Sequence, residues 1–128
     1  KTSLKMGLKV IFCIGETLQE KRKKIKKKIL IKQIENGLRN IKTKKNIIIA
    51  YEPVWAIGTG LIPKIKDLFL TIAFIKKKMK KVKILYGGSV NPKNIQQLKI
   101  IDNIDGFLVG GASQDSKKFI DIIKKTYN

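Results

Sequence analysis

The chain has 128 residues, 43% of them hydrophobic, which is enough for one packed domain and excludes a disordered tail. It shows neither an apolar run of about 20 residues, as a membrane span requires, nor the apolar segment of a signal peptide. The net charge of +20 leaves binding to nucleic acid open as a function class, because basic surfaces attract phosphate backbones.

Short apolar strands alternate with amphipathic helices along the whole chain. The predicted strands are residues 9–14, 46–51, 82–86 and 106–109. The predicted helices, in which apolar residues recur at helical spacing, are residues 25–41, 68–79, 92–100 and 119–123. Strands that alternate with helices predict parallel βαβ units with right-handed crossovers.

The number of units predicts half of a larger fold. A (β/α)₈ barrel takes eight βα units over about 250 residues, and this chain supplies four. We therefore expect one α/β half-barrel domain over residues 1–128, in a chain that is part of a longer protein, because it begins at Lys1 rather than Met. Four strands alone leave two unpaired edges and one uncovered face, which predicts aggregation, self-pairing or a missing half.

A single acidic residue, Glu52, stands at the carboxyl end of the second strand, where α/β enzymes keep their active sites. The loop after it begins with a proline, which fixes φ, and ends with two glycines, which supply backbone freedom. We expect this loop to be a lid made of Pro53, Val54, Trp55, Ala56, Ile57, Gly58, Thr59 and Gly60. The alternative is a strand-end glutamate that only solvates a turn.

Glycine-rich segments follow the second, third and fourth strands at residues 58–60, 87–89 and 110–113. Glycine lets backbone N–H groups approach an anion, and a following helix adds its positive end. One such segment is most often a tight turn. Because the three follow parallel strands, we expect them to converge on one phosphate group.

Other chemistries have no residues to carry them. The chain has no histidine, so it cannot assemble a Ser-His or Cys-His pair or a histidine metal site, and it lacks the glycine motifs of dinucleotide and ATP binding. No cofactor or metal is therefore expected. The lone Cys13 is expected to be a small core residue rather than a nucleophile, and its lack of a disulfide partner predicts a reducing, cytoplasmic compartment.

The basic residues are mostly lysine, since only Arg22 and Arg39 among 29 are arginines. Arginine is better suited than lysine to bidentate hydrogen bonds with phosphate and guanine. The lysines lie on predicted solvent-facing sides of helices rather than between aromatic residues that could stack on bases. We interpret the excess as compositional drift and expect no specific nucleic-acid partner. Non-specific binding to polyanions stays open.

Four runs resemble signatures of the triosephosphate isomerase family, in the family's order. They are Cys-Ile-Gly-Glu-Thr at 13–17, Ala-Tyr-Glu-Pro-Val-Trp-Ala-Ile-Gly-Thr-Gly at 50–60, Tyr-Gly-Gly-Ser-Val-Asn at 86–91 and Asp-Gly-Phe-Leu-Val-Gly-Gly-Ala-Ser at 105–113. The resemblance covers essentially the whole chain and corresponds to the C-terminal half of the family's TIM barrel.

The resemblance implies a function and roles for the site residues. The reaction would be the interconversion of dihydroxyacetone phosphate and glyceraldehyde 3-phosphate, without a cofactor, by a cytoplasmic homodimer. Glu52 would be the catalytic base. By similarity, N–H groups of Gly58, Ser89, Gly110 and Gly111 would hold the substrate phosphate, and Tyr86 and Ser89 would meet the closed lid.

The chain departs from the family in ways that leave two other readings open. The family's electrophilic histidine and its lysine belong to barrel strands outside this chain, Leu61-Ile62-Pro63 replaces the usual end of the lid, and the connection from Pro63 to Tyr86 is shorter than usual. One alternative is a non-catalytic half-barrel remnant that keeps a phosphate-binding face. The other, supported by charge alone, is a basic nucleic-acid-associated protein.

Overall fold

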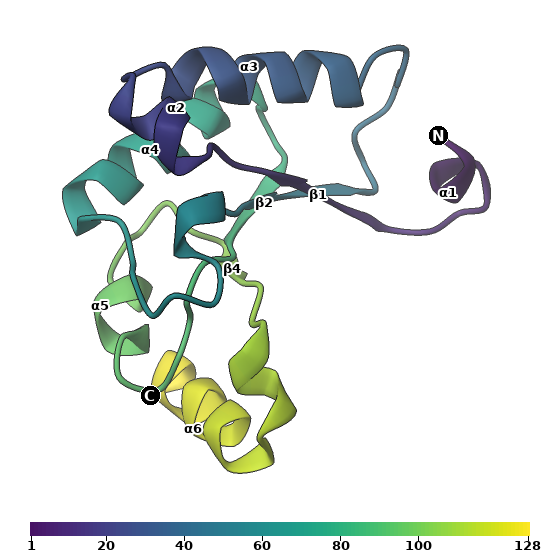
Figure 1. Cartoon of the computed structure of the whole chain (residues 1–128). Coiled ribbons are helices and arrows are strands. Elements are labelled where there is room, and N and C mark those ends of the chain that lie inside the picture. The colour runs from purple at the N-terminus through teal and green to yellow at the C-terminus, as the bar shows by residue number, and fades with distance from the viewer.

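The computed structural model describes residues 1–128 and contains one four-stranded parallel sheet (Figure 1). The strands pair in chain order and are β1 (Val10–Ile14), β2 (Ile47–Tyr51), β3 (Lys83–Tyr86) and β4 (Gly106–Phe107). Cys13, Ala50, Leu85 and Gly106 stand in one row across the sheet. The predicted parallel α/β arrangement is confirmed, and four parallel strands are what half of a (β/α)₈ barrel supplies.

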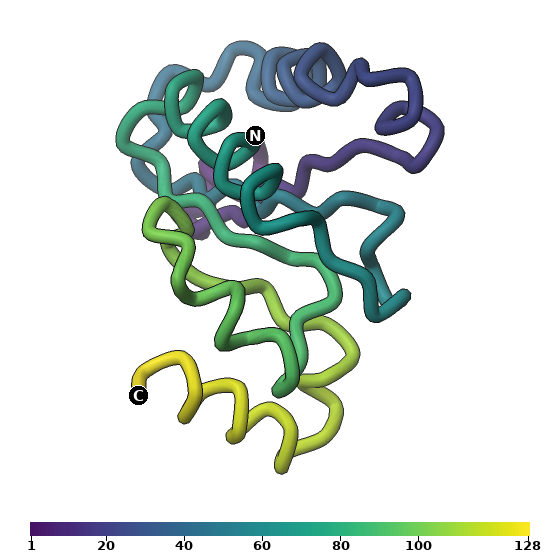
Figure 2. Tube along the Cα trace, turned by 90° about the vertical axis from the view of Figure 1, so that its left-hand side faces the viewer, coloured from purple at the N-terminus to yellow at the C-terminus, as the bar shows by residue number.

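The helices are α1 (Thr2–Lys5), α2 (Leu18–Arg22), α3 (Lys26–Gly37), α4 (Ile65–Lys78), α5 (Ile95–Lys99) and α6 (Ser116–Tyr127), with short 3₁₀ helices η1 (Val54–Ala56) and η2 (Gly111–Gln114). Helices α2 to α5 lie in the connections between the strands, α1 precedes β1 and α6 follows β4. Helix α3 packs on β1 and lies beside α4, which packs on β3, while α6 packs on α5 and η2 (Figures 1 and 2). None of these helices has the length and apolar character that crossing a membrane requires.

The core lies between the sheet and the helices that pack on it. Alternate strand residues point into it, as Ile49, Tyr51, Ile84 and Tyr86 show, each at most 1% exposed. They pack with apolar residues of α3, α4 and α5 in one cluster of 17 buried side chains, which holds the strand ends in place. No lysine is buried, so the lysines do lie at the surface as predicted.

The opposite sheet face has no helical cover, and Cys13 belongs to it. Its neighbours Phe12 and Ile14 point toward the helices, whereas Ile11 is 45% exposed and Cys13 is also exposed. The prediction of Cys13 as a small core residue is therefore wrong for this chain. Strand alternation places the residue on the uncovered face.

Several elements differ from the predictions: α4 begins earlier, at Ile65, α6 extends at both ends to Ser116–Tyr127, and the short helices α1 and α2 have no predicted counterpart. Helix α3 ends at Gly37 rather than near residue 41, because the chain turns through Asn40 at a left-handed φ of 62°. Strand β4 ends at Phe107 rather than at residue 109, although the Leu108 N–H still donates to the Tyr86 carbonyl at 2.9 Å. Helix α5 begins only at Ile95, after a turn of three residues.

Candidate active site

The carboxyl ends of β2, β3 and β4 surround a cavity of about 400 Å³. Its lining comes from three segments that the sequence singled out, namely the lid, the loop after β3 and the turn after β4. The lining residues are Glu52, Ile57, Gly58, Gly60, Gly87, Gly88, Ser89, Val90, Asn91, Leu108, Gly110, Gly111 and Ala112. Glu52 is the only charged side chain among them.

Glu52 is the first residue beyond β2, and its backbone continues the sheet by one step. Its N–H donates to the Ile14 carbonyl at 2.8 Å, which fixes the backbone from which the carboxylate projects. The side chain is half-buried and lies against Gly87. Pro53 follows and ends the strand because it has no N–H to donate.

The Cys13 thiol stands beside this carboxylate. Partial burial raises the pKa of Cys13 to about 11, and a hydrogen bond and the charge of Glu52 act in the same direction. The thiol is therefore neutral near pH 7 and is poorly suited to nucleophilic chemistry, because the thiolate is the reactive form.

The lid crosses from Glu52 to the loop after β3 and is fastened there by Ser89. The Ser89 hydroxyl donates to the Ala56 carbonyl at 2.6 Å and accepts from the Gly60 N–H at 2.9 Å. Gly58 and Gly60 have φ values of 69° and 78°, which only glycine adopts without strain. Thus Ser89 contacts the last residue of η1, Ala56, and the last residue of the lid, Gly60.

A buried carboxylate that the sequence reasoning did not assign anchors the base of the lid. Glu16 is 1% exposed and accepts hydrogen bonds from Trp55 Nε1 at 3.0 Å and from the Tyr51 hydroxyl at 3.0 Å. The Glu16 carbonyl also accepts the Val54 N–H at 3.0 Å. Burial raises the pKa of Tyr51, and the Glu16 charge adds to the effect. In the sequence, the only indication of a role for Glu16 is that it belongs to the Cys-Ile-Gly-Glu-Thr run at 13–17.

The lid tryptophan is also held from outside. The Lys21 ammonium lies 3.3 Å from the centre of the Trp55 ring, which is the geometry of a cation–π contact. Trp55 therefore joins the lid to β2 through Glu16 and to α2 through Lys21.

Six backbone N–H groups of the cavity wall have no acceptor within the chain, namely those of Gly58, Gly88, Ser89, Gly110, Gly111 and Ala112. They include all four residues predicted to bind phosphate. Such groups, unobstructed by side chains, form a concave anion site, and buried polar groups need a partner. The structure therefore brings the predicted donors and Glu52 to one cavity, while their roles toward a ligand stay a prediction.

Tyr86 lies differently from the other predicted site residues. It is fully buried, its ring centre is 6.4 Å from that of Tyr51, and its hydroxyl has no hydrogen-bond partner. Burial raises the pKa of this phenol, followed by the charge of Glu16. The structure gives Tyr86 no hydrogen bond to the lid, so its role as a lid partner stays a prediction.

No set of metal-ligating side chains accompanies the cavity. No group of three or more His, Cys, Asp or Glu residues that could hold a metal ion occurs in the structure. What the cavity offers is one carboxylate facing neutral backbone donors under a fastened loop. Such an arrangement can hold a small anion and move a proton on it.

Comparison with known proteins gives one consistent match. The family model for triosephosphate isomerase matches residues 1–126. A triosephosphate isomerase from Thermodesulfovibrio yellowstonii is 47% identical over 129 residues, covering 94% of this chain and 52% of that protein. The chain is also similar to triosephosphate isomerases from Leptospira biflexa and Candida albicans. The first is 45% identical, with 94% of this chain and 54% of that protein covered, and the second is 44% identical, with 97% and 53% covered. The chain spans about half the length of the curated relatives it matches.

Proposed function

This chain belongs to the triosephosphate isomerase family, and from that premise we propose that it carries the base and the phosphate-binding loops of an isomerase that interconverts dihydroxyacetone phosphate and D-glyceraldehyde 3-phosphate. One observation carries the proposal. A single carboxylate and six unpaired backbone N–H groups, the four predicted phosphate donors among them, line the same cavity. This is the pairing that a small phosphorylated substrate with an acidic C–H bond requires.

The backbone donors would hold the phosphate. Gly58, Ser89, Gly110 and Gly111 have unpaired N–H groups and line a cavity that no lysine or arginine lines. Backbone N–H groups can bind an anion without a positively charged side chain, because their dipoles present partial positive charge to it. The phosphate would thus orient the three carbons of the substrate relative to Glu52.

Glu52 would move the proton. A base beside the carbonyl-bearing carbon takes a proton from one carbon, leaves an enediolate, and returns the proton to the neighbouring carbon. The bond electrons stay within the substrate, so the reaction is an internal redox change and needs no cofactor. The lid held by Ser89 would exclude water while the enediolate exists.

The remaining groups of the reaction lie outside this chain. An enediolate oxygen needs a donor to stabilise its charge, and the chain has no histidine for that role. We expect a complete TIM barrel, with this chain as its C-terminal half, to supply the donor. The 128-residue chain alone is expected to show no turnover above the uncatalysed rate.

The family also suggests the setting of the complete protein. We propose a homodimer, in which the interface belongs to the half of the barrel absent here, and a cytoplasmic location, which the single unpaired cysteine supports. Sedimentation of the full-length protein tests the first, and fractionation of cells the second.

The test of the function uses the full-length protein with Glu52→Gln. Loss of a general base typically costs about 10²- to 10⁴-fold in turnover, whereas binding of glycerol 3-phosphate, which lacks the carbonyl, should stay within about threefold. Glu35→Gln, an exposed change on α3, is the control and should leave turnover intact. Unchanged turnover in Glu52→Gln refutes the assignment of the base. A stop codon directly upstream of a start codon before this segment would instead favour the non-catalytic half-barrel remnant.

A further inference from the structure

A second cavity lies between α3 and α4, at the end of the sheet away from Glu52. Its lining comes from α3, from the loop that precedes β2 and from the end of α4 before β3, so it lies toward the amino ends of the strands. The candidate active site stands at their carboxyl ends. The second cavity therefore belongs to neither the lid nor the phosphate-binding loops, and the proposed isomerase reaction does not use it.

The floor of this cavity is apolar. Five of its eight lining residues are hydrophobic: Ile31, Ile34, Leu38, Ile41 and Met79. Met79 and Ile34 are 2% and 7% exposed and form the deepest part, while the other three are partly exposed around them. The volume is about 280 Å³, just below the range of roughly 300–1,000 Å³ typical of small-molecule sites. Such a recess suits a short aliphatic chain.

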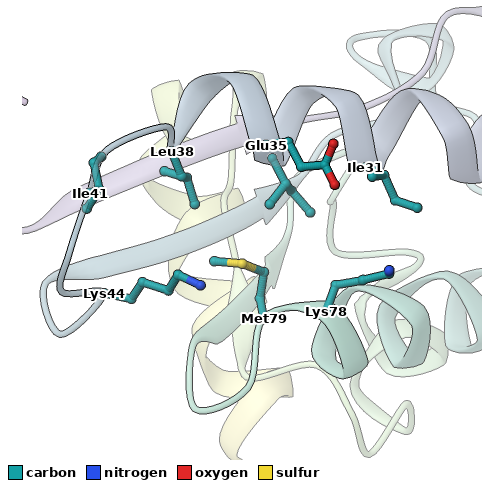
Figure 3. Close-up of a pocket in the computed structure, with 8 residues that line it drawn as sticks. Ile31, Glu35, Leu38, Ile41, Lys44, Lys78 and Met79 are labelled. Atoms are coloured by element: carbon teal, nitrogen blue, oxygen red, sulfur yellow. The ribbon is translucent and has the colours of Figure 1, made fainter.

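Two lysines from different elements stand at the edge of this floor. Figure 3 shows Lys44, from the loop before β2, and Lys78, from the end of α4, on either side of Met79. Neither ammonium lies within 4.0 Å of a carboxylate, so neither charge is neutralised within the chain. Glu35 lines the α3 side, and Figure 3 shows its carboxylate directed toward Ile31 rather than toward Lys44.

We propose that this cavity binds a medium-chain aliphatic carboxylate, with the chain on the apolar floor and the carboxylate beside Lys44 and Lys78. Burial of methylene groups on the apolar floor favours binding, and the exposed ammoniums of Lys44 and Lys78 at the rim attract a negative head group without both having to contact it. An ion without an apolar part would gain nothing from the floor, and a neutral chain would gain nothing from the two charges. The combination therefore selects an amphiphilic anion.

The experiment measures binding of decanoate to the full-length protein by calorimetry, with Lys44→Ala and Lys78→Ala as test variants. Lys45→Ala and Lys77→Ala are matched controls, because each removes the same charge from the next position without touching the cavity. Each test variant should weaken decanoate binding about two- to fivefold, and each control by less than about 1.5-fold. Decanol and butyrate should both bind more weakly than decanoate.

A second measurement reports the position of the ligand. The methyl resonance of Met79 should shift on addition of decanoate, and binding of glycerol 3-phosphate at the other site should stay unchanged. If Lys44→Ala and Lys45→Ala weaken decanoate binding equally, the overall positive charge explains the binding, and the proposal is overturned. So would binding that leaves the Met79 resonance unmoved, or an affinity for butyrate equal to that for decanoate.

Discussion

The side chain of Glu52 occupies the space in which a side chain on Gly87 would begin. A methyl group built on Gly87 would lie 2.8 Å from Oε1 and 2.7 Å from Cγ of Glu52. The Gly87 backbone is itself held, because its N–H donates to the Tyr51 carbonyl at 2.9 Å. Any added atom at Gly87 therefore displaces the carboxylate rather than the backbone.

We predict that Gly87→Ala in the full-length protein lowers turnover about 10²-fold, the loss associated with moving a reacting group by about 1 Å. Binding of glycerol 3-phosphate should change little, because Gly87 is not one of the four expected donors. A steady-state isomerase assay and calorimetry measure the two quantities. In a Glu52→Gln background the same change should have a much smaller effect, and an equal factor in both backgrounds would contradict displacement of Glu52.

The loop that supports Glu52 is tied to α3 by one side chain. The amide of Gln33 accepts the Gly15 N–H and donates to the Gly15 carbonyl, both at 2.9 Å. Gly15 in turn lies so close to the backbone carbonyl of Glu52 that no Cβ fits there. Gln33 thus positions the backbone under the proposed base without touching the cavity.

Gln33→Leu is predicted to destabilise the protein by about 1–3 kcal/mol, because it leaves two partly buried backbone groups without partners. Turnover should also fall, with the Michaelis constant nearly unchanged, since the phosphate donors stay in place. Denaturant unfolding and a steady-state assay check the two effects. Gln97→Leu, the same change at an exposed residue whose side chain makes no hydrogen bond, is the control and should stay within about 0.5 kcal/mol. If the Gln33 variant is as stable as this control, the Gln33 side chain does not hold the Gly15 backbone in place.

The strands and the glycine segments could be predicted because their signals are local. A run such as Ile47–Ala50 is apolar and β-branched whatever surrounds it. The glycines at 58, 87 and 110 follow strands directly, and parallel strands bring their carboxyl ends to one edge. Local pattern plus this one topological rule was enough to gather Glu52 and its expected donors.

Features that depend on distant contacts could not be predicted. Cys13 alternates to a sheet face that this chain leaves uncovered, so apolar flanking residues gave a misleading signal. Glu16 and Gln33 act through partners 18 or more residues away in sequence. The end of α3 depends on the turn through Asn40, whereas the apolar spacing continues past it to Ile41.

The tryptophan in the lid provides the next prediction, because Trp55 is the only tryptophan in the chain. Trp55→Phe keeps the ring in the lid but removes the donor to Glu16, a hydrogen bond to a charged group worth about 1.5–3 kcal/mol. The lid should then detach more often, and kcat/KM should fall by about tenfold or more. A steady-state assay checks the change.

Glu16→Gln tests the same contact from its other side while keeping the tryptophan as a fluorescent reporter. Trp55 emission should move toward that of an exposed indole in this variant, since the buried acceptor is weaker. Tyr127→Phe, at an exposed position on α6, is the control and should leave both emission and turnover unchanged. Unaltered emission in Glu16→Gln would mean that Glu16 does not hold the lid.

The thiol of Cys13 gives a prediction on pH. Its pKa is raised from 9.0 to about 11 in the folded chain, with burial as the largest cause and Glu52 as the second partner. A raised folded pKa means that the folded state holds the proton more tightly. The stabilising contribution is therefore complete below pH 9.0 and is lost as the pH rises toward about 11.

Alkylation by iodoacetamide measures this pKa directly, because only the thiolate reacts and the chain has one cysteine. The rate should still be rising above pH 9.0 and reach half its limit near pH 11. In Glu52→Gln the midpoint should move down, since the charge is removed, yet stay above 9.0, because burial remains the larger cause. Glu35→Gln removes a carboxylate from α3 and should not move the midpoint. An identical midpoint in Glu52→Gln and the unaltered chain would show that the Glu52 carboxylate does not raise the pKa of the Cys13 thiol. The two groups would then not interact, although the structure places them side by side.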